Sequence, residues 1–328
     1  MKNSKIVYMG TPEFAVAPLK SLLEKGFNIC AVITTPDKQV GRGQKITQSP
    51  VKIFALEHKL TVLQPTSLKD PEFIDQLKAL EAHLFIVVAF RMLPKEVWSI
   101  PKLGTFNLHS SLLPMYRGAA PINWAIINGE EKSGVTTFLI DENIDTGKIL
   151  YQQECEIEKS ANAGDLHDKL MHMGAQLVVK TAIDLINNNV CAVAQPNNHE
   201  GKELKAAPKL NKETGAINWN LHCIEVNNLI RGLSPYPAAH SILSSNSKKI
   251  AVKIFEAEPF VDQESTLLPG EIKTDGKSYL RVGCANGSLN IKLLQAAGRK
   301  RLAIREFLAG LRDAKSYSFI SKPNSNEK

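Results

Sequence analysis

Short apolar segments alternate with longer amphipathic ones through the first half of the chain. The strand-like and helix-like patterns follow one another in the order 5–9, 14–24, 29–34, 51–59, 84–89 and 94–99. Such alternation is typical of a parallel sheet covered by helices on both faces. The run from Leu84 to Phe90, LFIVVAF, is apolar without any polar interruption. It therefore predicts a strand that is buried on both faces, at the centre of the sheet.

The same alternation of strand-like and helix-like segments continues to about residue 189. Two further strands are predicted at 104–108 and 134–140, with a helix at 121–128 between them. A long amphipathic pattern at 162–187 has apolar residues at helical spacing and is expected to close the domain. We therefore expect residues 1–189 to form an α/β domain with a doubly wound, mainly parallel sheet.

The remainder of the chain has a different pattern. Residues 190–208 are polar and rich in turn-forming residues, which predicts a linker. After a helix-like piece at 221–233, short apolar runs recur about every ten residues, as in a small OB-like β-barrel. We expect this second domain to span 209–320 and to be followed by a flexible tail at 321–328.

The charge of the chain is unevenly distributed. The 328 residues contain 40 Lys and Arg against 33 Asp and Glu, a net charge of +7. Residues 1–208 are balanced at 22 of each sign, whereas residues 209–328 hold 18 basic and 11 acidic side chains. The excess therefore belongs to the predicted barrel and favours an anionic partner there, such as a nucleic acid. The candidate contacts in this region are Lys209, Lys212, Lys248, Lys249, Arg299, Lys300, Arg301 and Arg305.

Composition also restricts the class of protein. Hydrophobic residues make up 43% and charged residues 22%, which excludes wholesale disorder, a collagen-like repeat and a coiled coil. The five cysteines are widely separated and never form a C-x-x-C pair, which argues against a disulfide framework or a zinc ribbon. These unpaired cysteines favour a reducing, cytoplasmic location. The N-terminal apolar stretch soon reaches a Gly-Thr-Pro turn and the longest apolar run is far shorter than a membrane span, so we expect no signal peptide and no membrane segment.

The segment from Gly104 to Gly118, GTFNLHSSLLPMYRG, carries the first candidate chemistry. Asn107 and His109 are two positions apart on a predicted strand, so their side chains point to the same side about 7 Å apart. They also lie where a parallel strand ends, the edge at which such sheets bind ligands. The amide could donate to a developing oxyanion and the imidazole could transfer a proton, as acyl transfer requires. The alternative is that both side chains only satisfy the backbone of the following loop.

A group of carboxylates follows the strand at 134–140. Asp141, Asn143 and Asp145 match the first, third and fifth positions of a calcium loop, but Thr146 and Gln152 occupy positions that require Gly and Glu. A calcium loop is therefore rejected. We expect Asp145, which precedes a Thr-Gly turn, to orient the histidine, although a solvated acidic loop is the alternative.

Other common sites are not encoded. The chain has no G-x-S-x-G serine, no H-E-x-x-H, and neither of the glycine-rich nucleotide-binding patterns. The absence of a nucleophile favours direct transfer to an incoming nucleophile, with no metal and no nucleotide.

The segment at 35–51 is long, basic and glycine-bearing. We predict a flexible loop in which Lys38, Arg42 and Lys45 can reach a phosphate or a carboxylate. A solvated surface loop is the alternative.

Together these motifs resemble the methionyl-tRNA formyltransferases of bacteria and organelles. The resemblance rests on IVYMGTPEFAV, TTPDKQVGRGQKITQSPVK, NLHSSLLPMYRGAAPINWAI and GVTTFLIDENIDTGKILYQ. It runs from about Lys5 to Gln153 and continues more weakly through the linker and the second domain. The wider formyltransferase group, which includes glycinamide ribonucleotide transformylase, shares N-x-H, S-L-L-P and the later Asp. RGAAPI and the GRG loop favour the tRNA branch.

The resemblance implies roles for individual residues. Asn107, His109 and Asp145 match the catalytic triad of the family, and Arg42 matches an arginine that contacts the acceptor stem. The S-L-L-P motif associated with the folate corresponds to Ser111, Leu112, Leu113 and Pro114. The implied reaction transfers a formyl group from 10-formyltetrahydrofolate to the amino group of initiator Met-tRNA. The implied fold is a Rossmann-like formyltransferase domain with an OB-like tRNA-binding domain, and we expect a monomer.

The chain departs from the family pattern at two positions. Ser110 replaces the usual Gly or Pro after the histidine, and AFRM replaces an AYG-type sequence, which places Arg91 near the expected folate pocket. Two alternative functions remain: another folate-dependent formyltransferase or hydrolase acting on a small molecule, and a non-catalytic RNA-binding module. The second would explain the charge but not the Asn, His and Asp together.

Overall fold

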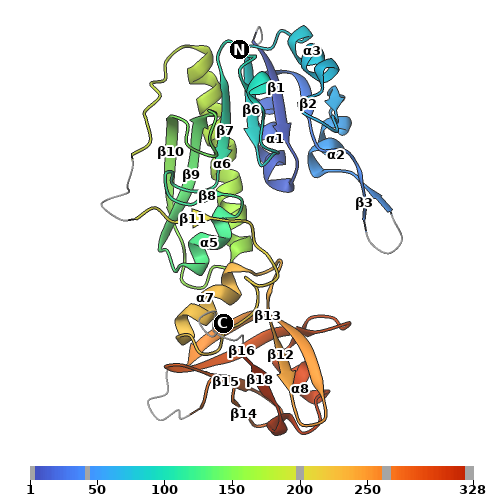
Figure 1. The fold of residues 1–328 in the computed structure, drawn as a ribbon, viewed down its shortest axis with the longest axis vertical. Coiled ribbons are helices and arrows are strands. Elements are labelled where there is room, and N and C mark those ends of the chain that lie inside the picture. The colour runs from blue at the N-terminus through green and yellow to red at the C-terminus, as the bar shows by residue number, and fades with distance from the viewer. Residues whose placement is uncertain (1–3, 41–44, 197–202, 261–266, 322–328) are drawn as a thin grey trace. The chain divides into compact units, whose positions relative to one another are not determined.

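The computed structural model describes residues 4–40, 45–196, 203–260 and 267–321 (Figure 1). The chain divides into two compact units. The first comprises residues 1–121, 132–156 and 167–207, and the second comprises 122–131, 157–166 and 208–328. The tail that we expected to be flexible lies outside the described residues from position 322 onward.

The first unit is built on a seven-stranded, mainly parallel sheet. Its strands, in spatial order, are β10 (Ile149–Glu156), β9 (Lys132–Leu139), β7 (Thr105–His109), β6 (Leu84–Val88), β1 (Lys5–Gly10), β2 (Asn28–Ile33) and β5 (Val62–Leu63). The strands from β7 to β5 are parallel, whereas β9 and β10 are antiparallel to their neighbours. All five residues of β6 are buried. The central, doubly buried strand predicted from LFIVVAF is thus confirmed.

Helices connect these strands. They are η1 (Glu13–Ala15), α1 (Val16–Glu24), α2 (Pro50–Glu57), α3 (Pro71–Ala79), α4 (Lys95–Trp98), α5 (Pro121–Ile127) and α6 (Ala163–Ile186). The sequence pattern did not predict α3, although its start is marked by Asp70, whose side chain caps the helix, and by Pro71 in the first turn. The buried pair Phe73 and Leu77, four residues apart, fixes its inner face.

Both faces of the sheet are covered. On one face Val7 and Met9 belong to a buried cluster that also contains Phe73 and Leu77 of α3. The next residues along β1 point the other way, and there the hydroxyl of Tyr8, fully buried, donates to the carbonyl of Ala15 at 2.6 Å. Alternate residues of one strand are therefore buried on opposite faces, as in a doubly wound sheet.

The segment at 35–51 differs from the flexible loop that we predicted. It contains β3 (Lys38–Val40) and β4 (Lys45–Thr47), which pair antiparallel as a hairpin. Arg42 lies outside the described residues, and so does the side chain of Lys45. Strands of three residues are too short to give a periodic signal, and this explains why the sequence pattern indicated a loop.

Three polar contacts fix the base of this hairpin. The hydroxyls of Thr34 and Ser49 lie 2.7 Å apart, and Lys52 Nζ is 2.7 Å from Asp37 Oδ2. Gln64 donates to the other oxygen of Asp37 at 2.8 Å. The hydrogen bonds from Lys52 and Gln64 lower the pKa of Asp37, so its carboxylate stays charged and retains Lys52 at neutral pH.

The second unit is a nearly closed antiparallel barrel, as expected. Its elements are α7 (Cys223–Gly232), β12 (Ala239–Ser244), β13 (Lys249–Phe260), β14 (Ile272–Thr274), β15 (Leu280–Cys284), β16 (Gly287–Ala296), β17 (Leu302–Ala303), α8 (Ile304–Ala309), η2 (Ala314–Ser316) and β18 (Ser318–Ile320). The spatial order is β14-β15-β16-β13-β12-β18, with β17 beside β16.

A backbone hydrogen bond joins the two edges of this barrel. Phe319 N in β18 donates to Gly270 O, just before β14, at 2.7 Å. Gly270 has φ +82°, and a Cβ there would overlap the carbonyl of Phe319. Glycine is therefore required where the edges meet. The interior is filled by apolar side chains, of which Trp219 is the largest and is fully buried.

The five cysteines are free and differ in burial. Cys191 is exposed, whereas Cys223 and Cys284 are buried in the core of the barrel. Burial, and secondarily the neighbouring Cys223, raises the pKa of Cys284 to about 12. Within the described ranges, no helix is both long enough and apolar enough to cross a membrane.

These environments predict the order of thiol modification. At pH 8 and in native buffer we expect Cys191 to react rapidly with a disulfide reagent and Cys284 to react only after unfolding, because a buried, protonated thiol is not nucleophilic. A Cys191→Ser variant should lose the rapid phase, as followed by absorbance and peptide mapping. Rapid native labelling of Cys284 would contradict its burial in the barrel core.

Candidate active site

Two polar side chains emerge at the carboxyl end of β7. Asn107 is partly exposed, whereas His109 is buried with 6% of its surface accessible. The Nε2 atom of His109 lies 2.9 Å from the carbonyl oxygen of Tyr116. A carbonyl only accepts, so Nε2 carries the hydrogen and Nδ1 faces elsewhere. Within the described parts of the chain, the amide of Asn107 has no hydrogen-bond partner and remains available to a ligand.

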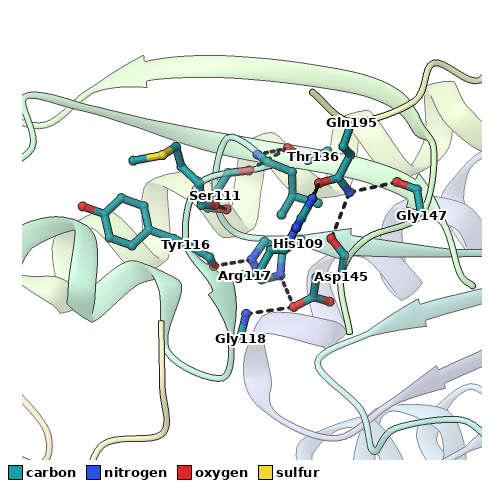
Figure 2. Close-up of polar contacts among 11 residues, drawn as sticks. His109, Ser111, Tyr116, Arg117, Gly118, Thr136, Asp145, Gly147 and Gln195 are labelled. Carbon is teal, nitrogen blue, oxygen red and sulfur yellow. Dashed lines mark hydrogen bonds and ion pairs between the residues drawn. The ribbon is translucent and has the colours of Figure 1, made fainter. Parts of the chain in front are cut away.

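Asp145 faces the other side of the imidazole ring. Its Oδ2 atom is 3.8 Å from His109 Nδ1 and accepts a hydrogen bond from Gly118 N at 2.9 Å (Figure 2). Asp141 instead accepts from Thr146 Oγ1 at 2.7 Å and so stabilises the loop internally. Of the two aspartates in this loop, the geometry brings Asp145 to the histidine.

The backbone between Tyr116 and Gly118 supports both groups. Tyr116 adopts φ +61°, a conformation that costs about 1–3 kcal/mol for a residue other than glycine and is typically retained at functional sites. Its N–H donates to Lys205 O at 2.7 Å. The next residues form β8 (Arg117–Gly118), which pairs in parallel with β11 (Ala206–Ala207). The chain around 205–207, in the predicted linker, thus holds the loop in place.

A second contact from the predicted linker was not expected from the sequence. Gln195 Oε1 accepts from Arg117 Nε at 3.1 Å and from the terminal guanidinium nitrogen of Arg117 at 2.6 Å. Its Nε2 donates to the carbonyl oxygens of Asp145 at 2.9 Å and Gly147 at 2.8 Å (Figure 2). A glutamine in a polar, turn-rich stretch carries no signal of such a role in a single sequence.

The loop from Ser111 to Pro114 is tightly constrained. Ser111 Oγ donates to Met115 O at 2.6 Å, and the carbonyl of Ser111 accepts from Thr136 Oγ1 at 2.7 Å. Gln152 Nε2 donates to Leu113 O at 2.7 Å. Ser111, Leu113 and Pro114 are buried, and only Leu112 of these four is partly exposed. The loop is therefore a rigid wall beside β7 whose side chains mostly point inward.

Arg91 has a structural role that the sequence did not indicate. Its two terminal nitrogens donate to Thr66 O at 3.1 Å and Pro65 O at 2.9 Å. Burial lowers the pKa of its guanidinium. The side chain thus connects the loop at residues 65–66 to the segment after β6. These hydrogen bonds explain the position of Arg91, and no ligand is needed to explain it.

The basic candidates are solvent-exposed. The described ones are Lys38, Lys209, Lys212, Lys248, Lys249, Arg299, Lys300, Arg301 and Arg305. Arg301 is the most constrained, because its guanidinium lies 3.8 Å from the centre of the Phe255 ring and donates to Pro235 O at 3.1 Å. No group of three or more metal-ligating side chains occurs among the residues that the structure describes.

Family models match both parts of the chain. Residues 4–182 match the model described as formyl transferase, and residues 209–312 match the model described as formyl transferase, C-terminal domain. Together these matches span most of the sequence.

Curated proteins give a closer comparison. The chain is 51% identical over 310 residues to the methionyl-tRNA formyltransferase of Bacteroides fragilis, covering 94% of this chain and 95% of that protein. It is 50% identical over 311 residues to the enzyme of the same name from Flavobacterium johnsoniae, covering 95% and 97%. Among solved structures, the sugar 3N-formyl transferase WlaRD superposes with a TM-score of 0.65 at 23% identity, covering 90% of this chain and 99% of that chain. This last likeness concerns the fold alone.

The position of Gly147 generates a prediction about the site. A Cβ at this residue would overlap the carbonyl of Leu139, so Gly147→Ala must displace the loop that carries Asp145. We expect catalytic efficiency to fall about 100-fold, since misplacement of a group by about 1 Å has an effect of this size. The measurement is steady-state kinetics on the folded variant.

The matched control is Gly310→Ala. The nearest atom to a Cβ at Gly310 is 3.6 Å away, and the backbone there has no positive φ. This variant should retain normal kinetics. Equal effects of the two substitutions would show that the turn at Gly147 does not position the site.

Proposed function

The chain belongs to the methionyl-tRNA formyltransferase family, and we propose that Asn107, His109 and Asp145 carry out its transfer of a formyl group to the methionine of initiator tRNA. The observation that carries this assignment is the arrangement at the end of β7. His109 is held at Nε2 by the carbonyl of Tyr116 and has the Asp145 carboxylate 3.8 Å from Nδ1, beside an amide that has no partner among the described residues. A positioned acid–base group and a free hydrogen-bond donor are what acyl transfer to an amine requires.

We propose 10-formyltetrahydrofolate as the donor. The amino nitrogen of methionine attacks the formyl carbon, forming a C–N bond and placing negative charge on the formyl oxygen. The amide of Asn107 would stabilise this oxyanion, a type of contact worth about 3 to 4 kcal/mol. The bond from the formyl carbon to the folate N10 then breaks, and the proton lost by the amine reaches the departing nitrogen. The products are the formylated tRNA and tetrahydrofolate.

His109 is the group placed to move that proton. The hydrogen on Nε2 is donated to the carbonyl of Tyr116. The nitrogen that can take up and release a proton is therefore Nδ1, which faces Asp145. A carboxylate 3.8 Å away stabilises positive charge on the ring while the proton is held there. Asp145 would thus orient the imidazole and stabilise its charged form during transfer.

The wall formed by Ser111, Leu112, Leu113 and Pro114 would shape the donor site. Its hydrogen bonds to Thr136 and Gln152 keep the loop rigid, so a planar pterin would meet a preformed surface rather than a mobile one. Leu112, which is partly exposed, is the side chain of the four that could contact it.

The tRNA would be held mainly by the basic second unit. Residues 209–328 carry the whole positive excess of the chain, and Lys209, Arg299, Lys300 and Arg301 are exposed there. In the first unit, the hairpin that bears Lys38 and includes Arg42 and Lys45 in its sequence would contribute a second contact region. Backbone phosphates are the natural partners of such side chains.

The catalytic assignment predicts distinct losses for two substitutions. His109→Ala should lower kcat by about 100- to 10,000-fold, because general acid–base catalysis is lost. Asn107→Ala should lower kcat by about 100- to 1,000-fold, because the oxyanion loses a donor. The assay is transfer from labelled 10-formyltetrahydrofolate to a mixture of initiator and elongator Met-tRNA.

The same assay separates the competing functions. Normal turnover by His109→Ala would remove the histidine from the mechanism. Transfer to a small amine or to water, with Met-tRNA left unmodified, would support the small-molecule formyltransferase or hydrolase. His172→Ala, an exposed histidine of α6, serves as the matched control and should retain full activity.

The location of the charge predicts a change in salt dependence. Replacing both Arg299 and Lys300 by Ala should weaken tRNA binding and reduce the slope of log affinity against log salt by about 1 to 2, since each neutralised phosphate contributes about 0.7 to 0.9. The control replaces Lys20 and Lys78, which are exposed and each lie near a carboxylate. Identical slopes for the two double variants would show that Arg299 and Lys300 do not contact phosphates.

A further inference from the structure

We propose that Gln195 is a positioning residue for catalysis, which acts by fixing Asp145 against His109. The inference rests on the proposed roles of these two residues. Gln195 comes from the segment after α6 and touches neither side chain of the pair directly. Its effect on the reaction must therefore pass through the backbone that it holds.

The side-chain amide of Gln195 is fully used. Its NH2 group has two hydrogens, which go to the carbonyls of Asp145 and Gly147, and its oxygen has two lone pairs, both of which accept from Arg117. A side chain with all four positions satisfied is held in one orientation. The two carbonyls that it binds belong to the loop that carries the Asp145 carboxylate.

Arg117 links this amide to the other half of the site. It lies between Tyr116, whose carbonyl receives the hydrogen of His109 Nε2, and Gly118, whose N–H binds Asp145 Oδ2. The contacts therefore form a closed ring that runs from His109 through Tyr116, Arg117 and Gln195 to Asp145 and back to the imidazole (Figure 2). Opening the ring at Gln195 removes the hydrogen bonds to the carbonyls of Asp145 and Gly147 and leaves the contact from Gly118 N–H to Asp145 Oδ2.

The conformation of Asp145 makes this restraint necessary. The residue has φ +55°, in the left-handed region that residues other than glycine rarely adopt. Such a conformation persists only where the surroundings over-determine it. Water could satisfy the two carbonyls if Gln195 were removed, but water would not hold them at a fixed distance from Arg117.

The test compares two variants of Gln195 with a matched control in the full-length protein. Gln195→Ala removes all four hydrogen bonds. Gln195→Glu keeps the acceptor for Arg117 but cannot donate to the two carbonyls. We expect both to lower kcat by about tenfold or more while KM for Met-tRNA and for the formyl donor changes less than about twofold, since only the reacting geometry is altered. Gln153→Ala, an exposed glutamine on β10, should leave both constants unchanged.

A double-mutant cycle with Asp145→Asn distinguishes this inference from the proposed function. If Gln195 acts through Asp145, replacing it in the Asp145→Asn background should lower kcat less than about threefold further. The positioning role would be overturned if the losses in kcat from the two single variants multiplied in the double variant. It would also be overturned if Gln195→Ala changed only KM, or lowered only the melting temperature while kcat stayed normal. Full activity of Asp145→Asn itself would instead overturn the catalytic assignment. If Gln195→Ala does not fold, Gln195→Glu decides by the same criteria.

Discussion

The site depends on the orientation of one imidazole ring. A backbone carbonyl from the turn at Tyr116 fixes Nε2, and a carboxylate from the loop after β9 faces Nδ1. Neither turn is relaxed, because Tyr116 and Asp145 both have positive φ. Conformations of this kind cost about 1–3 kcal/mol each, so the neighbouring contacts must stabilise them. The pairing of β8 with β11 supplies that support on one side.

Two glycines allow the backbone to approach closely enough for these contacts. A Cβ at Gly118 would overlap the carbonyl of Ala207, and one at Gly147 would overlap the carbonyl of Leu139. Gly118 donates to Asp145, and Gly147 accepts from Gln195. Steric restriction therefore explains why glycine follows Arg117 and Thr146 in the sequence. Any side chain at either position would separate segments that together define the site.

Much of this architecture could be predicted from local pattern. The parallel core could be predicted because its central strand is uniformly apolar. Asn107 and His109 could be selected as candidates because the carboxyl ends of parallel strands meet at one edge of a sheet, where ligands bind. The hairpin was missed because its strands have three residues each. Gln195 was missed for a different reason: its partner Arg117 is 78 positions away, and nothing in a polar segment indicates a tertiary contact of that range.

The positive excess of the chain lies outside the region that carries His109. The residues around His109 belong to the part of the chain whose charges balance, whereas the excess of +7 lies after residue 208. Salt weakens attraction between exposed charges and phosphates but has little effect on buried contacts such as those of His109. Affinity for an anionic substrate can therefore vary with ionic strength while the reacting geometry stays constant. The loop that carries Asp145 is held by contacts within its own unit, to which Arg117, Gln195 and β11 contribute.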